Sequence, residues 1–398
     1  MRVGSNFSGI GAWEIALRDL GIDYKLMFFS EIDKYTIKSY CAVHDVDESL
    51  NIGDITKIEG HEVPDIDLFV YSPPCQAFSV AGKQGGFDDH RGVLFFDSLR
   101  IIKAKQPKIA IMENVKGLTG KKFKAEFQEM LDALVESGYN NYWKVLNAKD
   151  YGIPQNRERV FVVSIRKDVD IYADTLEGFV WPEPFDSGLR LKHMLESHVD
   201  EKYYIDNAKF TTHSQNISYA IDANYAKGAS QSDLTNGKRQ VVIESNECQV
   251  IGKAEGIKGH DYNRRVYNTD GVSPSIAAHS GGNLEPKVVE RTPLKFLDRN
   301  GKQMDGNYAF CVDTTQIGGV KEIDQQGFRI RKLTPKETWR LQGFKDTDFD
   351  KAQAAGISNS QLYKQAGNSI CSVVPRAIFE RLIGLLTSEV TEESEVIA

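Results

Sequence analysis

Along the first 170 residues, short apolar runs alternate with stretches whose apolar positions recur at helical spacing. The apolar runs predict strands, and the amphipathic stretches between them predict helices. The expected strands are Arg2–Asn6, Lys25–Ser30, Asp67–Ser72, Lys108–Glu113, Asn141–Ala148 and Val160–Ile165. The expected helices are Gly11–Leu20, Lys34–His44, Leu94–Lys105 and Phe123–Ser137. This alternation predicts an α/β fold with a doubly wound, mostly parallel sheet.

The pattern changes after about residue 175. Residues 180–325 are rich in Asn, Ser, Thr, Gly and Asp, with short β-like runs and no long amphipathic helix, which indicates a second, smaller, mainly β domain. Helical signals return with the capping box Thr334-Pro335-Lys336-Glu337 and the amphipathic stretch Val373–Leu386. We therefore expect a first domain over 1–175, a second over 176–326, a segment over 327–388 that completes the first, and an acidic tail over 389–398.

Composition and charge narrow the class of protein. Of 398 residues, 41% are hydrophobic and 26% are charged, which is ordinary for a globular protein. The net charge of −7 does not by itself indicate a nucleic-acid binder, although a local basic groove is enough to contact phosphates. No apolar stretch reaches the length of a membrane span, and the first expected strand follows Met1 directly. The five cysteines include no Cys-x-x-Cys pair. We expect a cytoplasmic protein with no disulfide framework and no metal.

The segment Ser72-Pro73-Pro74-Cys75-Gln76 follows the apolar run that ends at Tyr71. Proline fixes its own φ and restricts the residue before it, so the thiol of Cys75 is held at the end of a strand. In an open α/β sheet, ligands bind outside the carboxyl ends of the strands. Cys75 is therefore a candidate nucleophile, and a small buried turn residue is the alternative.

A second candidate site begins with Phe7-Ser8-Gly9-Ile10-Gly11, between the first strand and the first helix. Glycines there let the backbone approach a ligand beside a helix N-terminus, although Glu14 replaces the third glycine of a dinucleotide fingerprint. Glu31, at the end of the second strand, can hold ribose hydroxyls, and Asp54 can meet an adenine amino group. The combination predicts a cofactor that contains adenosine. The alternatives are a glycine turn of no special purpose and an aspartate in an ordinary turn.

Two further segments carry charged groups near the ends of strands. Glu113 ends the fourth expected strand, at the same sheet edge as Cys75. A buried carboxyl at that edge can exchange a proton with a ring nitrogen, or it can simply cap the next helix. Arg157 and Arg159 precede the sixth expected strand, where one can face the site and the other can hold structure or phosphate. A plain charged loop is the alternative.

Jointly, these segments form an ordered set of motifs. Along the chain these are Phe7–Gly11, Ser72–Gln76, Glu113–Val115, Gln155–Arg159, Arg331–Pro335 with Leu341–Phe344, and Gln365–Ser369. The set closely resembles the DNA (cytosine-5)-methyltransferase family of prokaryotic or phage type. The resemblance covers residues 1–170 and 327–385. The middle region matches only in position, where that family has its target recognition domain. The resemblance implies a Rossmann-like methyltransferase sheet.

The resemblance also implies a reaction and its residues. A methyl group passes from S-adenosylmethionine, which leaves as S-adenosylhomocysteine, to C5 of a flipped-out cytosine in a specific short duplex DNA sequence. Cys75 matches the thiolate that adds to C6, Glu113 the acid at N3 and the exocyclic amine, Arg159 the arginine near O2, and Arg157 its neighbour near the catalytic loop. The implied cofactor residues are Phe7, Gly9, Gly11, Glu31, Ile32, Asp54, Pro74 and Asn368. Most members have a larger, often aromatic residue in place of Ile32, where it stacks on adenine.

The implied partner is double-stranded DNA, for a monomer that works beside a restriction endonuclease or as a solitary or phage enzyme. Residues 76–92, rich in glycine and basic residues, match a mobile lid that closes on DNA. A tRNA-methylating branch is an alternative, but its Cys-Phe-Thr signature is absent, since Cys248 and Cys311 precede Gln and Val. A catalytically silent DNA-binding relative is another alternative, against which the intact Cys75, Glu113 and Arg159 argue.

Overall fold

The computed structural model describes residues 1–74, 94–203 and 328–387, together with the backbone of short strands between residues 210 and 304. The chain divides into two compact units. Unit 1 contains Met1–Arg190 and Pro335–Ala398 with Pro274–Ser280, and unit 2 contains Leu191–Ser273 and Gly281–Thr334. The predicted roles of the segments 1–175, 176–326 and 327–388 stay predictions.

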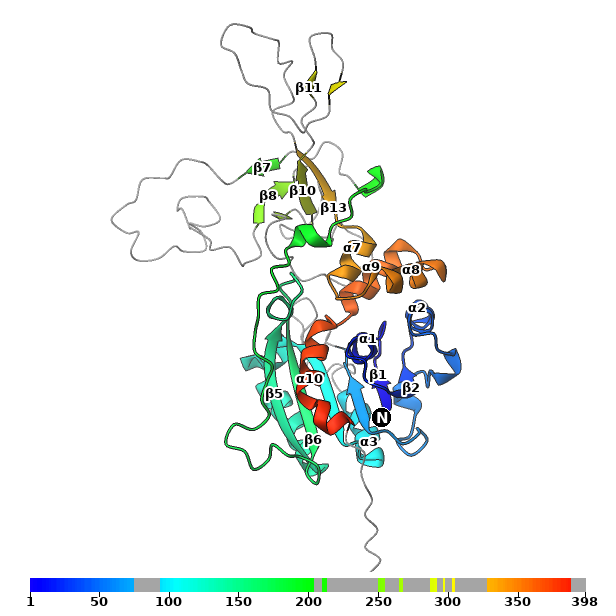
Figure 1. Ribbon diagram of the computed structural model, residues 1–398. Helices are drawn as coiled ribbons and strands as arrows, with labels where there is room; N and C mark the ends of the chain where they lie inside the picture. The colour runs from blue at the N-terminus through cyan, green and yellow to red at the C-terminus, as the bar shows by residue number, and fades with distance from the viewer. Residues whose placement is uncertain are drawn as a thin grey trace, which may run out of the picture. The chain divides into compact units, whose positions relative to one another are not determined.

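Unit 1 is built on a six-stranded sheet in the order β2-β1-β3-β4-β6-β5 (Figure 1). The strands are β1 (Arg2–Asn6), β2 (Lys25–Ser30), β3 (Leu68–Tyr71), β4 (Ile109–Val115), β5 (Tyr139–Asn147) and β6 (Glu158–Arg166). The first four run parallel, β6 is antiparallel to β4, and β5 is antiparallel to β6. The predicted α/β fold with a mostly parallel sheet is therefore confirmed.

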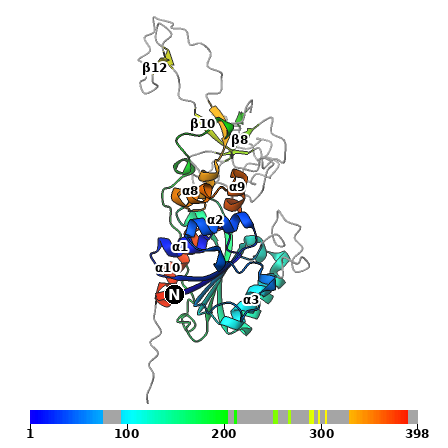
Figure 2. The same ribbon diagram turned by 90° about the vertical axis from the view of Figure 1, so that its right-hand side faces the viewer.

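Helices cover both faces of this sheet, as Figure 2 shows for α1 and α3. The helices of the first 140 residues are α1 (Ala12–Asp19), α2 (Lys34–His44), α3 (Leu94–Lys105) and α4 (Lys124–Glu136). Alternate residues of β3 face opposite sides. Val70 joins a core cluster with α1 and with the C-terminal helix α10 (Val373–Thr387), while Tyr71 joins a cluster with α3 and α4. Short 3-10 helices are Glu48–Leu50, Ile55–Lys57, Lys116–Thr119, Lys121–Phe123 and Ala148–Asp150.

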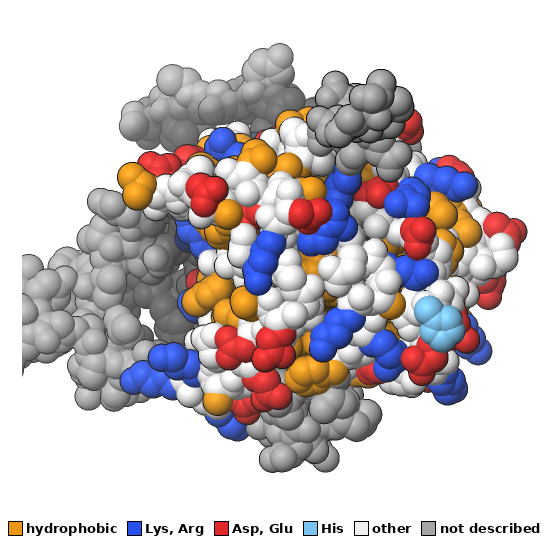
Figure 3. All heavy atoms as spheres, turned by 90° about the horizontal axis from the view of Figure 1, so that it is seen from below, with side chains coloured by type: hydrophobic (Ala, Val, Ile, Leu, Met, Phe, Trp, Pro, Cys, Tyr) orange, Lys and Arg blue, Asp and Glu red, His pale blue; other side chains and the backbone are white. Residues whose placement is uncertain are grey.

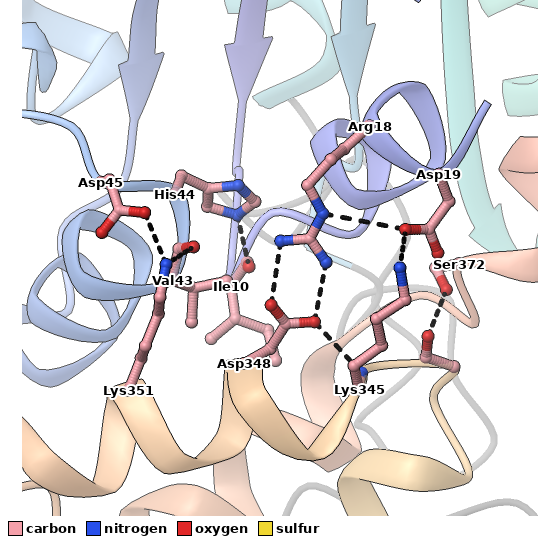
Figure 4. Close-up of polar contacts among 11 residues, drawn as sticks. Ile10, Arg18, Asp19, Val43, His44, Asp45, Lys345, Asp348, Lys351 and Ser372 are labelled. Atoms are coloured by element: carbon pink, nitrogen blue, oxygen red, sulfur yellow. Dashed lines mark hydrogen bonds and ion pairs between the residues drawn. The ribbon is translucent and has the colours of Figure 1, made fainter. Parts of the chain in front are cut away.

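The C-terminal segment of unit 1 contributes α7 (Pro335–Arg340), α8 (Asp346–Ala354), α9 (Asn359–Asn368) and α10 (Val373–Thr387). Helix α8 is tied to α1 by a two-pronged pair, in which Arg18 donates to both carboxylate oxygens of Asp348 at 2.9 and 2.8 Å (Figure 4). Beside it, Lys345 Nζ donates to Asp19 Oδ1 at 2.7 Å. These pairs hold the C-terminal helices against the helices that begin the chain.

Unit 2 contains a five-stranded sheet in the order β13-β10-β9-β8-β7. Its strands are β7 (Phe210–Thr212), β8 (Val250–Ala254), β9 (Arg265–Tyr267), β10 (Lys287–Arg291) and β13 (Phe328–Lys332). A separate antiparallel pair joins β11 (Phe296–Leu297) and β12 (Gln303–Met304). Two 3-10 helices, Leu191–Met194 and Glu201–Tyr203, precede the sheet.

The surface of the described part mixes both signs of charge. On the face drawn in Figure 3, Lys and Arg side chains are interspersed with Asp and Glu, and hydrophobic side chains are scattered among them. Among the residues with a described structure, no helix has the length and apolarity to cross a membrane.

Candidate functional site at the carboxyl edge of the sheet

The carboxyl ends of β1, β3 and β4 meet at one edge of the sheet. Asn6 pairs with Tyr71, and Tyr71 pairs with Met112, so Phe7, Ser72 and Glu113 follow at the same level. Strand β6 runs the other way, which brings its first residues to this edge, with Arg159 opposite Val115. The parallel strands β1, β3 and β4 and the antiparallel strand β6 therefore bring groups from four separate parts of the sequence to this edge.

Glu113 and Arg159 form an ion pair at this edge. Arg159 Nε lies 3.1 Å from Glu113 Oε1, and the two side chains are 19% and 10% exposed. Burial raises the pKa of the Glu113 carboxyl, against the opposing charges of Arg159 and Arg157 and a hydrogen bond from Ser72. A carboxyl with a raised pKa can take up a proton from a ligand or donate one to it.

Arg157 makes different contacts from Arg159. It is 4% exposed, and its Nη2 donates to the backbone carbonyls of Gly367 and Ser369 at 3.0 and 2.7 Å. These carbonyls lie at the end of α9, on either side of Asn368. Arg157 therefore binds the C-terminal segment, whereas Arg159 forms an ion pair with Glu113.

The turn after β3 is held from both neighbouring strands. Asn114 Nδ2 donates to the carbonyl of Pro73 at 3.2 Å, and the Ser72 amide donates to the carbonyl of Asn6 at 3.3 Å. Asn114 is 2% exposed, and sequence reasoning gave it no role of its own, although it directly follows Glu113. Pro74 is half-buried, while Cys75 and the predicted lid over 76–92 lie outside the described residues.

The turn between β1 and α1 depends on unusual backbone angles. Phe7, Gly9 and Gly11 have positive φ values of 54°, 55° and 81°. A Cβ on Gly11 would lie 1.9 Å from His44 Nε2, and that nitrogen is 3.0 Å from the Ile10 carbonyl oxygen (Figure 4). A Cβ on Gly9 would meet nothing within 4 Å. The turn is therefore packed on the Gly11 side and open at Gly9.

Glu31 is fixed beside this turn by backbone amides. Its Oε2 accepts from Gly9 at 3.2 Å, and its Oε1 accepts from Ile32 at 2.8 Å and from Asp33 at 3.0 Å. Burial raises the pKa of Glu31 more than these three hydrogen bonds lower it. Ile32 is 74% exposed next to this carboxyl.

Asp54 and Asn368 are the remaining predicted cofactor residues. Asp54 caps the 3-10 helix Ile55–Lys57, and its Oδ1 accepts from the amide of Thr56 at 3.1 Å and from the Thr56 hydroxyl at 2.8 Å. These hydrogen bonds lower the pKa of Asp54, and the bond from the Thr56 hydroxyl has the largest effect. Asn368 is exposed at the end of α9.

The residues around Gly9 fit an adenosine group. A fixed acid can accept hydrogen bonds from vicinal hydroxyls, an exposed apolar side chain can cover a ring, and the space at Gly9 admits a close approach. In the part of the chain that the structure describes, no group of three or more His, Cys, Asp or Glu side chains is arranged to hold a metal ion.

Comparison with known proteins gives the family. The sequence model of the family described as C-5 cytosine-specific DNA methylase matches residues 1–384. The orphan methyltransferase M.Rho11sI of Bacillus phage rho11s is 36% identical, over 99% of this chain and 99% of its own. The type II methyltransferase M2.ScrFI of Lactococcus lactis subsp. cremoris is 30% identical, over 96% of this chain and 99% of its own.

Solved structures show the same fold. The Entamoeba histolytica methyltransferase EhMeth has a TM-score of 0.61 at 15% identity, covering 98% of this chain and 99% of its own. A putative DNA modification methyltransferase from an Escherichia coli prophage has a TM-score of 0.56 at 18% identity, covering 98% of this chain and 100% of its own. From the match across residues 1–384 and the full-length relatives, the chain belongs to the C-5 cytosine-specific DNA methylase family and is a DNA (cytosine-5)-methyltransferase.

Proposed function

We propose that this enzyme methylates C5 of a flipped-out cytosine in one short duplex DNA sequence, with S-adenosylmethionine as donor and a covalent bond between Cys75 and C6. The observation that carries the proposal is the meeting, at one sheet edge, of the Glu113–Arg159 pair with the Pro73–Pro74 turn that leads into Cys75. The turn at Gly9 and the acid Glu31 lie at the same edge.

Each residue has a defined task in this proposal. C5 of cytosine is a poor nucleophile, so the Cys75 thiolate first adds to C6 and forms a sulfur–carbon bond. Glu113 holds a proton at ring nitrogen N3, and Arg159 stabilises negative charge near O2, while the displaced electron pair moves toward C5. S-adenosylmethionine, when bound, supplies an electrophilic methyl group. After the methyl group has bonded to C5, the hydrogen that C5 originally carried is lost as a proton to water. The sulfur–carbon bond at C6 then breaks, and Cys75 leaves as the thiolate.

The raised pKa of Glu113 supports its part in this scheme. An acid that holds a proton at N3 must be protonated, or share a proton with the ring, near neutral pH. Burial favours this state, and the Arg159 charge opposes it. Burial and the Arg159 charge thus act on the pKa of Glu113 in opposite directions, and the effect of burial is the larger.

The proposed contacts with S-adenosylmethionine lie at and beside the turn between β1 and α1. Glu31 would accept hydrogen bonds from the ribose hydroxyls, Ile32 would pack on the adenine ring, and the backbone at Gly9 would approach the ligand closely. The other proposed cofactor residues are Phe7, Gly11, Asp54, Pro74 and Asn368. Asp54 Oδ1 already accepts two hydrogen bonds from Thr56, so an adenine amino group would have to use Oδ2, which lies 3.5 Å from Lys57 Nζ.

The activity can be tested directly. Unmethylated DNA is incubated with the protein and S-adenosylmethionine, and bisulfite sequencing then locates conversion-resistant cytosines. We expect resistance in one short sequence, and its absence in every context would contradict the proposal. Replacing Cys75 with Ala should abolish transfer, whereas undiminished transfer would remove Cys75 as nucleophile. A Glu31→Ala variant with unchanged cofactor affinity in calorimetric titration would reject the ribose contact.

We also propose that the enzyme acts alone, without a cognate restriction endonuclease, and that residues 176–326 select its sequence. The phage relatives that match over nearly the whole chain are named orphan methyltransferases. Exchanging residues 176–326 for the matching region of such a relative should change the methylated sequence. An extract of the source cells that cleaves unmethylated, but not methylated, DNA at that sequence would contradict the solitary role.

A further inference from the structure

Helix α9 is joined to α2 by side chains at two successive positions. Lys364 Nζ donates to Asp33 Oδ2 at 2.6 Å. Gln365 is 2% exposed, and both ends of its side-chain amide are hydrogen-bonded. Its Oε1 accepts from Ser39 Oγ at 3.0 Å, and its Nε2 donates to the Tyr35 carbonyl at 3.1 Å. We call this group, Asp33, Tyr35, Ser39, Lys364 and Gln365, the α2–α9 clamp.

Asp33 connects the clamp to Glu31. Its amide donates to Glu31 Oε1 at 3.0 Å, and its Oδ1 caps α2 by accepting from the amides of Tyr35 at 2.9 Å and Thr36 at 3.1 Å. The other oxygen, Oδ2, is the one that Lys364 binds. Asp33 is therefore held from both sides, and it links Lys364, through Oδ2, to the Glu31 carboxylate, through its amide.

The far end of α9 is held by Arg157. The carbonyls of Gly367 and Ser369 both accept from Arg157 Nη2, at 3.0 and 2.7 Å. Asn368 lies between them, so its backbone is fixed relative to the start of β6, while the clamp fixes α9 relative to α2. The position of Asn368 relative to Glu31 thus depends on contacts that neither residue makes itself.

We infer that Lys364 and Gln365 are positioning residues for the methyl donor. They set the spacing between the turn of Glu31 and Ile32 on one side and Asn368 on the other, without touching the ligand. The inference rests on the proposed function, since it takes Glu31 and Asn368 as cofactor contacts. A ligand held between two elements binds more tightly when their spacing is fixed in advance, because less ordering is left for the binding step.

The test measures the affinity of the full-length protein for S-adenosylmethionine by calorimetry. Gln365→Leu keeps the side-chain size but removes both hydrogen bonds, and we expect affinity to fall about 5- to 20-fold. Lys364→Met removes a half-exposed ion pair, and we expect a fall of about 2- to 5-fold. The matched control is Lys345→Met, which breaks the pair with Asp19 that also ties the C-terminal segment to the first helices (Figure 4). We expect it to change affinity less than about twofold.

Two further measurements separate positioning from general stability. At saturating S-adenosylmethionine and DNA, kcat of Lys364→Met should remain close to wild type while KM for S-adenosylmethionine rises. The combination with Asp33→Asn should be less than additive in affinity, because Lys364 acts through Asp33. A stability effect alone would lower the unfolding temperature and leave KM unchanged. Should Gln365→Leu fail to fold, Lys364→Met still decides the question.

The outcomes also separate this inference from the proposed function. If wild type does not bind S-adenosylmethionine, or if Glu31→Ala binds it as well as wild type does, the proposed cofactor site is wrong. If wild type binds and Glu31→Ala does not, but the Lys364 and Gln365 variants match the Lys345→Met control, only the positioning role is wrong.

Discussion

Asn114 donates a hydrogen bond from its side-chain amide to the carbonyl of Pro73, at 3.2 Å, and so ties β4 to the turn after β3. The same asparagine directly follows Glu113, so one short segment supplies the proposed acid and fixes the turn that leads to the proposed nucleophile. The Asn114 side chain therefore fixes Pro73, two residues before the proposed nucleophile, relative to the strand that carries Glu113.

Asn114→Ala should lower kcat because the turn loses this support. We expect a fall of about 10- to 100-fold with little change in cofactor affinity, since a displacement of about 1 Å at a reacting group is enough for such a loss. Steady-state kinetics and calorimetry measure the two quantities. Gln128→Ala, which removes a surface hydrogen bond to Asp132 on α4, is the control and should behave as wild type. Unchanged kcat in Asn114→Ala would contradict the role.

The roles of Glu113 and Arg159 should be distinguishable by the pH dependence of the reaction rate. Glu113→Gln should lower kcat by about 10²-fold or more, because the amide cannot exchange a proton with N3. In the wild type, the rate should fall as pH rises through the raised pKa of Glu113, since the protonated form is the active one. Removing the Arg159 charge takes away a cause that lowers this pKa. In Arg159→Met, the slower residual reaction should therefore lose rate at a higher pH, and an unshifted profile would contradict the assignment.

Alanine substitutions at the two glycines of the cofactor turn should differ in their effects on stability and on cofactor binding. In Gly11→Ala the new Cβ would lie 1.9 Å from His44 Nε2 at a φ of 81°, so we expect about 2 kcal/mol or more of lost stability. In Gly9→Ala the Cβ meets nothing, and we expect about 1 kcal/mol from the positive φ of 55°. Urea unfolding measures both. Gly9→Ala should also weaken cofactor binding, because we propose that the ligand approaches the backbone at Gly9. Equal losses of stability in the two variants would contradict the packing argument.

Glu14 should make stability depend on pH. It is fully buried on α1, and burial raises its pKa, opposed more weakly by its own backbone and by the nearby hydroxyl groups of Ser5 and Tyr40. For a glutamate whose pKa is raised by folding, the stabilising contribution is complete below its unfolded pKa of about 4.3 and is lost as pH rises through the folded pKa. Glu14→Gln has no such loss. Compared by urea unfolding, the variant should gain stability relative to wild type between pH 5 and pH 8, and a constant difference would contradict this.

Much of the fold could be predicted because its signals are local. Apolar runs such as Leu68–Tyr71 and the helical spacing of Leu94–Lys105 report the buried face of one element, whatever packs against it. The family also follows from local signals, since each motif is a few residues long and their order is read directly along the chain. The place of β6 between β4 and β5 was not predicted, because strand order depends on pairing partners and not on the pattern within a strand.

The amino-acid sequence was therefore enough to predict the strands and helices, the family, and the candidate acid and cofactor turn. The resemblance already gave Arg157 and Arg159 different roles, but only the tertiary structure showed which groups each of them binds. One meets carbonyls at Gly367 and Ser369, and the other meets Glu113. The clamp of Ser39 and Gln365 joins residues 326 positions apart. Such contacts leave no periodic mark on either segment, because each depends on how distant elements pack together.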